Sequence, residues 1–235
     1  MMDEEQERLS MKQQFVWLND MLDSLPVQTM IYDGIEADDT IAYITKHTQH
    51  DLDGEVVIVS TDKDFLQLVS DKVSVFSPTK KKMYNRQVVF DEFGIWPENL
   101  LLYRTLDGDK SDNIPGIKGC GVKTLLKRFP ELSEDRTITH EEFFKMCEEK
   151  QGKIKMYDDI LKAKDQLLMN KRLMELDNPH IPTNQKLQIL DRFNVDDTEF
   201  KKLDFLRVGQ KYKVLQNWRD INDWLHSTFH NIITK

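Results

Sequence analysis

The sequence contains few cysteines, and their spacing indicates no special chemistry. Cys120 and Cys147 are the two cysteines among 235 residues, so a scaffold held by several disulfides is excluded. Neither belongs to a CxxC pair or to a Cys/His ligand set, so a thiolate metal site is not indicated. We expect both thiols to be reduced, without a metal-binding or catalytic role.

Long apolar runs are also missing. The longest, such as Val56 to Val59, are far shorter than the roughly 20 residues that a membrane-spanning helix needs. The amino terminus is acidic instead of basic and apolar, which is not the pattern of a secretory signal. We therefore expect a cytosolic chain without membrane contact.

A nucleotide-binding glycine loop is absent as well. Gly121 to Thr124 superficially resembles a P-loop, but the adjacent Gly-Lys pair and the preceding glycine spacing are missing. Nucleotide binding at this segment is therefore rejected.

Acidic residues are abundant, and seven of the 41 gather in three clusters that lie far apart in the chain. Carboxylates confined to a common site repel one another and would hold protons unless cations offset their charge. Such oxygen ligands suit Mg²⁺ or Mn²⁺, and the chemistry they indicate is phosphoryl transfer. The clusters are Glu36, Asp38 and Asp39; Asp62 and Asp64; and Asp109 and Asp112.

Basic residues crowd the segment around and after the third acidic cluster. A formal charge of −8 argues against a polyanionic partner unless charge is distributed unevenly. A second basic run, Lys80 to Lys82 with Arg86, lies near an expected hairpin, where an exposed turn explains it at least as well. The first group is a plausible phosphate-binding patch and consists of Lys110, Lys118, Lys123, Lys127 and Arg128.

Apolar periodicity predicts an α/β order in the first part of the chain. Val56 to Val59 is a continuous apolar run, typical of a strand buried on both faces of a parallel sheet. We expect an amphipathic helix over 4–24, strands at 27–32, 55–60 and 73–76, and helices through 40–44 and 65–69.

Two acidic clusters follow predicted strands. In open α/β sheets, ligands gather beyond the carboxyl ends of the strands, so these clusters should share one edge of the sheet. Aspartate is also favoured in the first turn of a helix, and one cluster alone could be a helix cap. Two clusters at one edge, with a third in a Gly/Pro-rich loop, favour a metal site.

From Trp96 onward the pattern becomes helical. A helix over 100–106 should end at Asp107 to Asp109, before the glycine-rich segment 113–124. A glycine-rich hairpin between two helices lets the backbone approach phosphates and grip a duplex without reading its sequence. Beyond residue 131 we expect helices, with Trp218, Trp224 and Phe229 packing the last of them.

Three ordered motifs closely resemble the 5′-nuclease superfamily, which includes flap endonucleases, phage ribonuclease H and the 5′-nuclease domain of bacterial DNA polymerase I. The motifs are Gly34 to Asp39, Ser60 to Phe65 and Gly108 to Gly121, within a resemblance that covers residues 5–130. It implies an α/β fold, with a PIN-like core over 1–95 whose mostly parallel sheet has flanking helices. A helix-three-turn-helix element and a helical carboxyl-terminal region would occupy 96–235.

The resemblance also implies roles for individual residues. The seven clustered acids would be catalytic and would bind, directly or indirectly, two Mg²⁺ or Mn²⁺ ions about 4 Å apart. These ions would activate a water and stabilise the departing 3′-oxygen, and K⁺ would bind to carbonyls of the hairpin loop. The DNA-binding residues would be Gly116, Ile117, Lys118, Gly119, Gly121, Lys123, Thr124 and Lys127.

The sequence departs from the family at its amino terminus, where relatives carry two further strands with metal-binding acids and a helical arch. The missing strands would leave an apolar sheet edge unpaired. Three interpretations follow. The chain is the carboxyl-terminal part of a nuclease, with the other part supplied by a separate polypeptide or lost through gene interruption or a misassigned start. Alternatively, it is a self-sufficient nuclease with fewer ligands, or a non-catalytic module that binds DNA duplexes or junctions.

The expected activity is structure-specific 5′→3′ hydrolysis, as an exonuclease or flap endonuclease, at junctions of DNA or RNA·DNA duplexes. Primer removal in bacterial or phage replication would place it in the cytoplasm of a bacterium or an infected host. A replisome protein and a separate amino-terminal fragment are the candidate protein partners.

Overall fold

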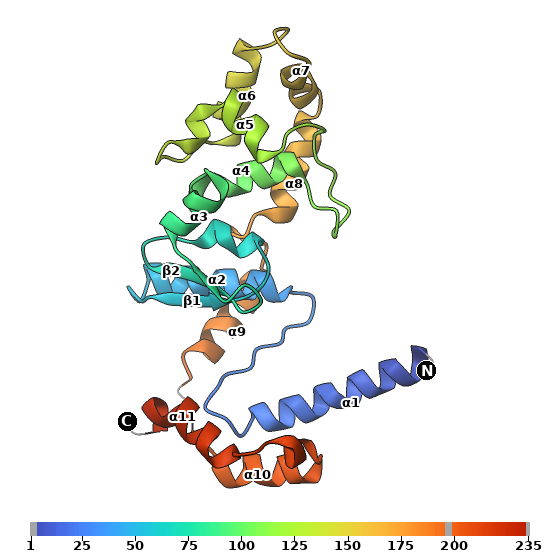
Figure 1. The fold of residues 1–235 in the computed structure, drawn as a ribbon, viewed down its shortest axis with the longest axis vertical. Coiled ribbons are helices and arrows are strands. Elements are labelled where there is room, and N and C mark those ends of the chain that lie inside the picture. Colours follow the sequence, from blue (N-terminus) through green and yellow to red (C-terminus); the bar gives the residue numbers. More distant parts are fainter. Residues whose placement is uncertain (1–3, 196–198, 234–235) are drawn as a thin grey trace. The chain divides into compact units, whose positions relative to one another are not determined.

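The computed structural model describes residues 4–195 and 199–233, and the chain divides into two compact units (Figure 1). One unit comprises residues 1–33 and 184–235, and the other comprises residues 34–183. We call them the terminal unit and the central unit. This division differs from the boundary expected at residue 95. Helix α4 (Pro97–Asp107) packs on the 3₁₀ helix η1 (Asp64–Leu68), so both sides of that position share one core.

A three-stranded sheet lies in the central unit. Strand β1 (Val56–Val59) pairs in parallel with β2 (Val73–Ser77), and β2 pairs antiparallel with β3 (Lys82–Tyr84). The register sets Val56 beside Val73, and Val75 beside Tyr84. Only the first of these two pairings is parallel, so the sheet in the described residues is mixed. The expected hairpin before Arg86 is confirmed.

Two predictions for apolar segments are wrong. The segment Val27 to Tyr32 forms no strand and follows an irregular path with Ile31 exposed. Strand β1 forms as predicted but is covered on one face, where Ile58 is buried, while Val57 and Val59 are 56% and 67% exposed. Apolar composition gives a segment strand propensity, but a neighbouring strand or helix must still cover it.

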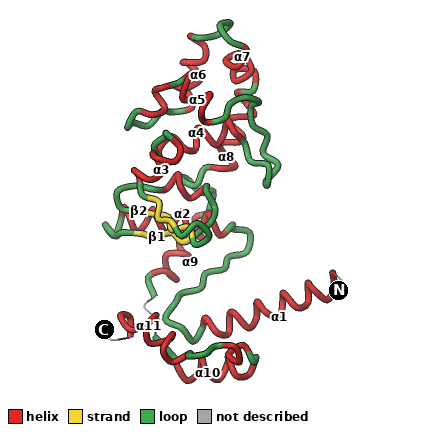
Figure 2. Tube along the Cα trace, in the orientation of Figure 1, coloured by secondary structure: helices red, strands yellow, loops and turns green. Residues whose placement is uncertain are grey.

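Helices make up most of the central unit (Figure 2). Helix α3 (Arg86–Phe93) begins where the Asn85 side chain accepts a hydrogen bond from the Val88 amide, and it ends at left-handed Gly94. Helix α6 (His140–Glu149) begins with a similar cap at Thr139. The other helices of this unit are α2 (Ala37–His50), α5 (Val122–Arg128), η2 (Pro130–Ser133), α7 (Lys155–Lys162) and α8 (Lys164–Met174).

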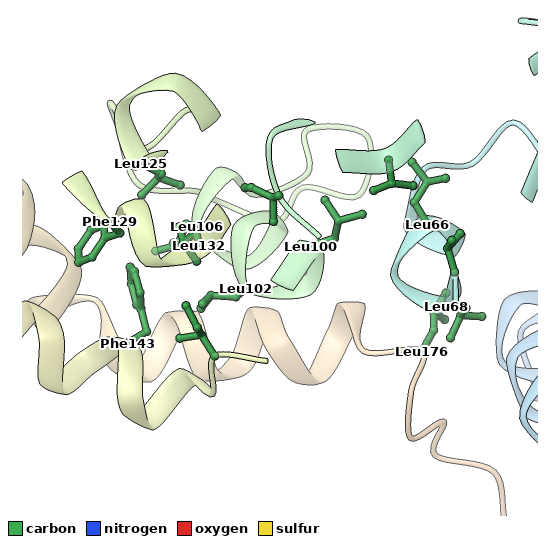
Figure 3. Packing of buried hydrophobic residues seen from close by; sticks show 14 of the residues in the cluster. Leu66, Leu68, Leu100, Leu102, Leu106, Leu125, Phe129, Leu132, Phe143 and Leu176 are labelled. Carbon is green, nitrogen blue, oxygen red and sulfur yellow. The ribbon is translucent and has the colours of Figure 1, made fainter. Parts of the chain in front are cut away.

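One hydrophobic core runs through the central unit (Figure 3). Phe129 and Phe143 pack with ring centroids 4.6 Å apart, and Leu106 of α4 belongs to the same core. The core continues to Leu66 and Leu68, both in η1. Helix α4 packs on α8 and on η1, so its apolar side chains belong to this core. This packing fixes the loops at both ends of the helix.

The terminal unit is helical and has a small core. Phe205, Leu225 and Phe229 form this core, and Trp218 and Trp224 contact the Phe205 ring. Trp224 and Phe229 of the last helix pack within this unit, while Trp218 precedes that helix. No helix in the described part of the chain is both long and apolar enough to cross a membrane. The helices are α1 (Glu4–Leu22), α9 (Thr183–Phe193), α10 (Lys202–Lys211), η3 (Val214–Asn217) and α11 (Ile221–Ile233).

Candidate metal centre and nucleic-acid interface

The first acidic cluster lies at the start of helix α2. Glu36 is the N-cap residue, although its side chain makes no capping hydrogen bond, and Asp38 and Asp39 occupy the first turn. Both aspartates are half-buried, while Glu36 is exposed. The partial positive charge of the helix start stabilises carboxylates here, but it leaves their remaining lone pairs available to a ligand.

The second cluster follows the carboxyl end of β1. The Asp62 amide donates to the Ser60 hydroxyl at 3.1 Å, and the Asp62 carboxylate accepts the Asp64 amide at 2.8 Å. These contacts form a tight turn that leads into η1. Asp62 is exposed, whereas the Asp64 side chain is 19% exposed and lies beneath it in the fold.

The third cluster lies in the loop after helix α4. Asp109 and Ile114 exchange backbone hydrogen bonds of 2.9 and 2.7 Å, which close the loop between them. The Asp109 carboxylate accepts the Ser111 amide at 2.7 Å and also the Ser111 hydroxyl. Asp112 lies inside this closed loop and is exposed.

Electrostatic effects on Asp38 connect all three clusters. Burial raises the pKa of Asp38, and the negative charges of Asp62, Glu36, Asp39 and Asp112 raise it further, in that order. Residues separated by more than 70 positions in the sequence therefore act on one carboxyl group. This mutual repulsion is what the sequence predicted for carboxylates at a common site.

Asp64 and Asp109 are coupled to each other through Arg104 of α4. The guanidinium Nη2 lies 2.8 Å from Asp64 Oδ1 and 2.5 Å from Asp109 Oδ2. Burial raises the pKa of Asp64, against the opposing charge of Arg104. Hydrogen bonds from Ser111 and then Arg104 lower the pKa of Asp109 to about 2. Sequence reasoning missed Arg104, which stands inside a helix five residues before Asp109.

His180 is a second residue that the sequence did not single out. It is exposed, and its charge lowers the pKa of Asp39, against the larger effects of burial and of Glu36, which raise it. The histidine therefore lies near the first cluster, although 141 positions separate it from Asp39. Because His180 is so distant in the sequence, the motif that contains Asp39 could not reveal it.

The acids suit a hard divalent cation in their donor chemistry, since all of them offer carboxylate oxygens. Across residues 4–195 and 199–233, however, no three Asp, Glu, His or Cys side chains lie close enough to hold a metal ion. The structure thus brings the seven predicted acids into one electrostatic neighbourhood without bringing them to ligand distances.

The predicted DNA-binding loop joins α4 to α5. The Ile117 amide donates to the Leu106 carbonyl at 2.7 Å, and Asn170 of α8 donates to the Pro115 carbonyl at 2.8 Å. Gly119 has a φ of +88°, and a Cβ atom added at Gly119 or at Gly121 would meet nothing within 4 Å. The loop is therefore anchored at its base and open at Gly119 and Gly121.

The residues predicted to bind DNA lie in this loop and in α5, and most of them are on the surface. Ile117 is half-buried, and the rest are exposed. Within the described structure, no ion pair or hydrogen bond engages the side chains of Lys118, Lys123 or Lys127. Unpaired ammonium groups are available to a polyanion. The exposed residues are Gly116, Lys118, Gly119, Gly121, Lys123, Thr124 and Lys127.

Three members of the second basic run, Lys80, Lys82 and Arg86, form ion pairs within the fold. Lys80 and Lys82 pair with Glu92 at 3.0 and 2.7 Å. Burial alone would raise the pKa of Glu92, but hydrogen bonds from Lys82, Lys80 and Tyr84 lower it to about 2. Arg86 is held by Glu98 and Asp135. These pairings favour a structural role for the hairpin over phosphate binding.

Both cysteines are buried free thiols. Burial raises the pKa of Cys120 to about 11 and that of Cys147 to about 12. Thiols that stay protonated at neutral pH are poor nucleophiles and poor metal ligands.

Comparison with known proteins shows similarity to 5′-3′ exonucleases. Residues 4–94 match the model of the 5′-3′ exonuclease, N-terminal resolvase-like domain. The 5′-3′ exonuclease of Aquifex aeolicus is 44% identical over 100 residues, a match that covers 41% of this chain and 34% of that protein. DNA polymerase I of Bacillus subtilis is 33% identical over 170 residues, which covers 69% of this chain and 18% of the polymerase.

The chain is similar to members of the 5′-nuclease superfamily. Solved structures agree: the T5 D15 protein co-crystallised with metal ions has 25% identity and a TM-score of 0.53. A T5 D15 flap endonuclease complex with DNA and metal ions has a TM-score of 0.54. Each comparison covers 77% of this chain and 62% of the T5 chain. The matched part of this chain spans less than half the length of the two curated proteins named above.

Proposed function

We propose that the chain carries out divalent-metal-dependent, structure-specific 5′→3′ hydrolysis of DNA or RNA·DNA near duplex junctions. The observation that carries this proposal is the convergence of the three motifs: Arg104 contacts both Asp64 and Asp109, and the charges of Asp62 and Asp112 act on Asp38 and raise its pKa. A cation at their meeting point would relieve the repulsion. The names of the relatives, 5′-3′ exonuclease and flap endonuclease, support hydrolysis as the reaction.

The metal site of the proposal uses oxygen donors alone. Two Mg²⁺ or Mn²⁺ ions, when bound, would supply an activated water and charge stabilisation for the departing oxygen. The chain's own contribution is to position its carboxylates, which the turns at Asp62 and Asp109 do through hydrogen bonds from the Asp64 and Ser111 amides. The proposed ligands are Glu36, Asp38, Asp39, Asp62, Asp64, Asp109 and Asp112.

The proposed duplex-binding element runs from Gly116 to Lys127 and comprises the loop after α4 together with most of α5, as a helix-three-turn-helix. Its open glycines permit close approach of a phosphate, and its lysines offer unpaired charge. Carbonyl oxygens of the same loop are the proposed K⁺ site. Because these contacts read the backbone, the element should bind duplexes without sequence preference.

A protein partner is also part of the proposal. The face of β1 that carries Val57 and Val59 is exposed, and an apolar strand face in this state favours association with another segment. We propose an amino-terminal nuclease fragment as the polypeptide that covers it. Copurification of such a fragment with the tagged chain is the expected result, and Val57→Lys with Val59→Lys should abolish it. Primer removal in the cytoplasm of a bacterium or a phage-infected cell is the proposed setting.

The central test is cleavage of a 5′-labelled flap and of an RNA·DNA hybrid with Mg²⁺ or Mn²⁺. Asp62→Asn should abolish cleavage and leave duplex binding intact, because it removes a carboxylate without changing volume. Asp71→Asn, an exposed acid of the same unit outside the clusters, is the matched control. Equal cleavage by both variants would contradict the proposal. Duplex binding without hydrolysis, with or without the amino-terminal fragment, would indicate a binding module instead.

A further inference from the structure

Arg104 occupies an unusual place for a cation. Its Nε also donates to Asp64 Oδ1 at 2.8 Å, so two nitrogens of one guanidinium hold that carboxylate. The side chains of Arg104, Asp64 and Asp109 are 19%, 19% and 17% exposed. These three side chains are therefore largely shielded from water. An ion pair in such surroundings is stronger than one at the surface.

The other acids of the centre have no comparable partner. In the part of the chain that the structure describes, no lysine or arginine forms an ion pair with Asp38, Asp62 or Asp112. The guanidinium charge is thus concentrated at two carboxylates that come from two different motifs. It contacts both of them, and both are among the proposed ligands of a divalent cation.

We propose that Arg104 is an exchangeable counter-ion of the metal centre, which holds Asp64 and Asp109 when no metal is bound and yields at least one of them to a divalent ion. The inference rests on the proposed metal centre. A guanidinium is charged at every relevant pH, so it cannot lose its charge when a metal ion binds. Arg104 must then either move away or share the carboxylates with the metal ion. Two cations on the same oxygens repel each other, and metal binding therefore works against Arg104.

The exchange has a measurable consequence for affinity. Removing the guanidinium leaves two uncompensated carboxylates next to the binding site, which makes the local potential more negative. Arg104→Gln should therefore bind Mn²⁺ about tenfold more tightly than the native chain, since even one screened unit charge at such distances exceeds 1 kcal/mol in effect. A purely structural arginine would give the opposite result, because its loss would disorder the ligands.

The experiment is calorimetric titration of the full chain with Mn²⁺, using native protein, Arg104→Gln, Arg104→Lys and Arg86→Gln. Arg86 is the matched control, because it also bridges two acids, Glu98 at 2.8 Å and Asp135 at 2.5 Å, within the same unit. Arg104→Lys keeps the charge and should keep near-native affinity. Arg86→Gln should not change affinity, and the Mn²⁺-induced rise in Tm should be largest for Arg104→Gln.

The outcomes separate this inference from the proposed function. Mn²⁺ binding that is unchanged or weakened in Arg104→Gln, or tightened equally in Arg86→Gln, would overturn the exchange. Absence of binding in every variant would overturn the exchange and the metal centre together. Tighter binding in Arg104→Gln without hydrolysis of any nucleic acid would support the exchange and count against the nuclease proposal.

A second measurement observes the native arginine directly and holds even if Arg104→Gln does not fold. Nitrogen-15 NMR of the native chain resolves arginine Nε–H groups, and the Arg104→Lys variant assigns the relevant signal. Titration with Mg²⁺ should shift the Arg104 signal and leave that of Arg86 in place. A stationary Arg104 signal at saturating Mg²⁺ would refute the exchange.

Discussion

The two units of this chain differ in how they use apolar residues. The central unit buries a continuous core that includes Phe129, Phe143 and Leu106, and it contains every acid of the candidate metal centre. The terminal unit buries a core of three residues and leaves Phe15, among others, exposed on α1. The unit that contains the candidate metal centre is thus the more tightly packed one, while the terminal unit exposes more of its apolar side chains.

The largest expected effect tests whether the chemistry belongs to the central unit alone. Asp112→Asn should lower the cleavage rate by on the order of a thousandfold, which is about 4 kcal/mol of transition-state stabilisation. Asp204→Asn, an exposed acid of the terminal unit that pairs with Arg207, should cleave at the native rate. Single-turnover rates on a flap substrate measure both. A comparable loss in the two variants would show that the units do not divide the work.

Core substitutions test the difference in packing. Phe143→Ala should lower the free energy of unfolding of the central unit by about 3–5 kcal/mol, because the ring is fully buried and its removal leaves a cavity. Phe205→Ala should act on the terminal unit. Hydrogen exchange should accelerate over α4 to α8 in the first variant and over α10 and α11 in the second. Acceleration of both regions by either change would show one cooperative unit.

The pH dependence of stability should come partly from a buried histidine of the central unit. Burial lowers the pKa of His140 to about 4, and its ring lies 3.2 Å from the Thr105 hydroxyl. The folded state holds His140 neutral, so its contribution is complete above the ordinary pKa of 6.5 and is lost as pH falls towards 4. The loss should reach up to about 3 kcal/mol.

Urea unfolding at pH 7 and at pH 4.5 measures this effect. His140→Gln should flatten the dependence, whereas His50→Gln, at the exposed end of α2, should leave it as in the native chain. An unaltered pH dependence in His140→Gln would refute the assignment.

The smallest expected effect concerns the duplex grip. Lys123→Ala should weaken duplex binding threefold to tenfold, about 1 kcal/mol, and reduce the salt slope by about 0.9 for the lost phosphate contact. Lys202→Ala, an exposed lysine of the terminal unit, should change neither quantity. Fluorescence anisotropy across a salt series tests both. A native salt slope in Lys123→Ala would remove this lysine from the interface.

Much of the candidate site could be predicted from the sequence because its parts are local. Asp38 and Asp39 lie in the first turn of the amphipathic run that forms α2, and Asp62 follows an apolar run that forms β1. Helix α1 and strand β2 also form within two residues of their expected bounds. Turn chemistry and apolar periodicity act over a few residues, so they are visible without the fold.

The remaining features depend on contacts between distant segments. Arg104 meets Asp64 across 40 positions, and nothing in its helix marks it as different from a solvated arginine. The segment 27–32 has strand propensity, but a strand needs a neighbour and none pairs with it in the described structure. The apolar run of β1 likewise could not reveal that one of its faces lacks a cover.

The meeting of Gly108 and Gly116 restricts how the loop between them can change in length. A Cβ atom on Gly116 would overlap the Asp107 carbonyl, and one on Gly108, where φ is +76°, would overlap Gly116. The backbone from 108 to 116 thus forms a tightly closed loop whose two ends are in contact. An inserted residue would have to widen this loop and would turn Asp112 away from the other acids. The β2–β3 hairpin, by contrast, has an open end at Lys81, so new residues can be accommodated there.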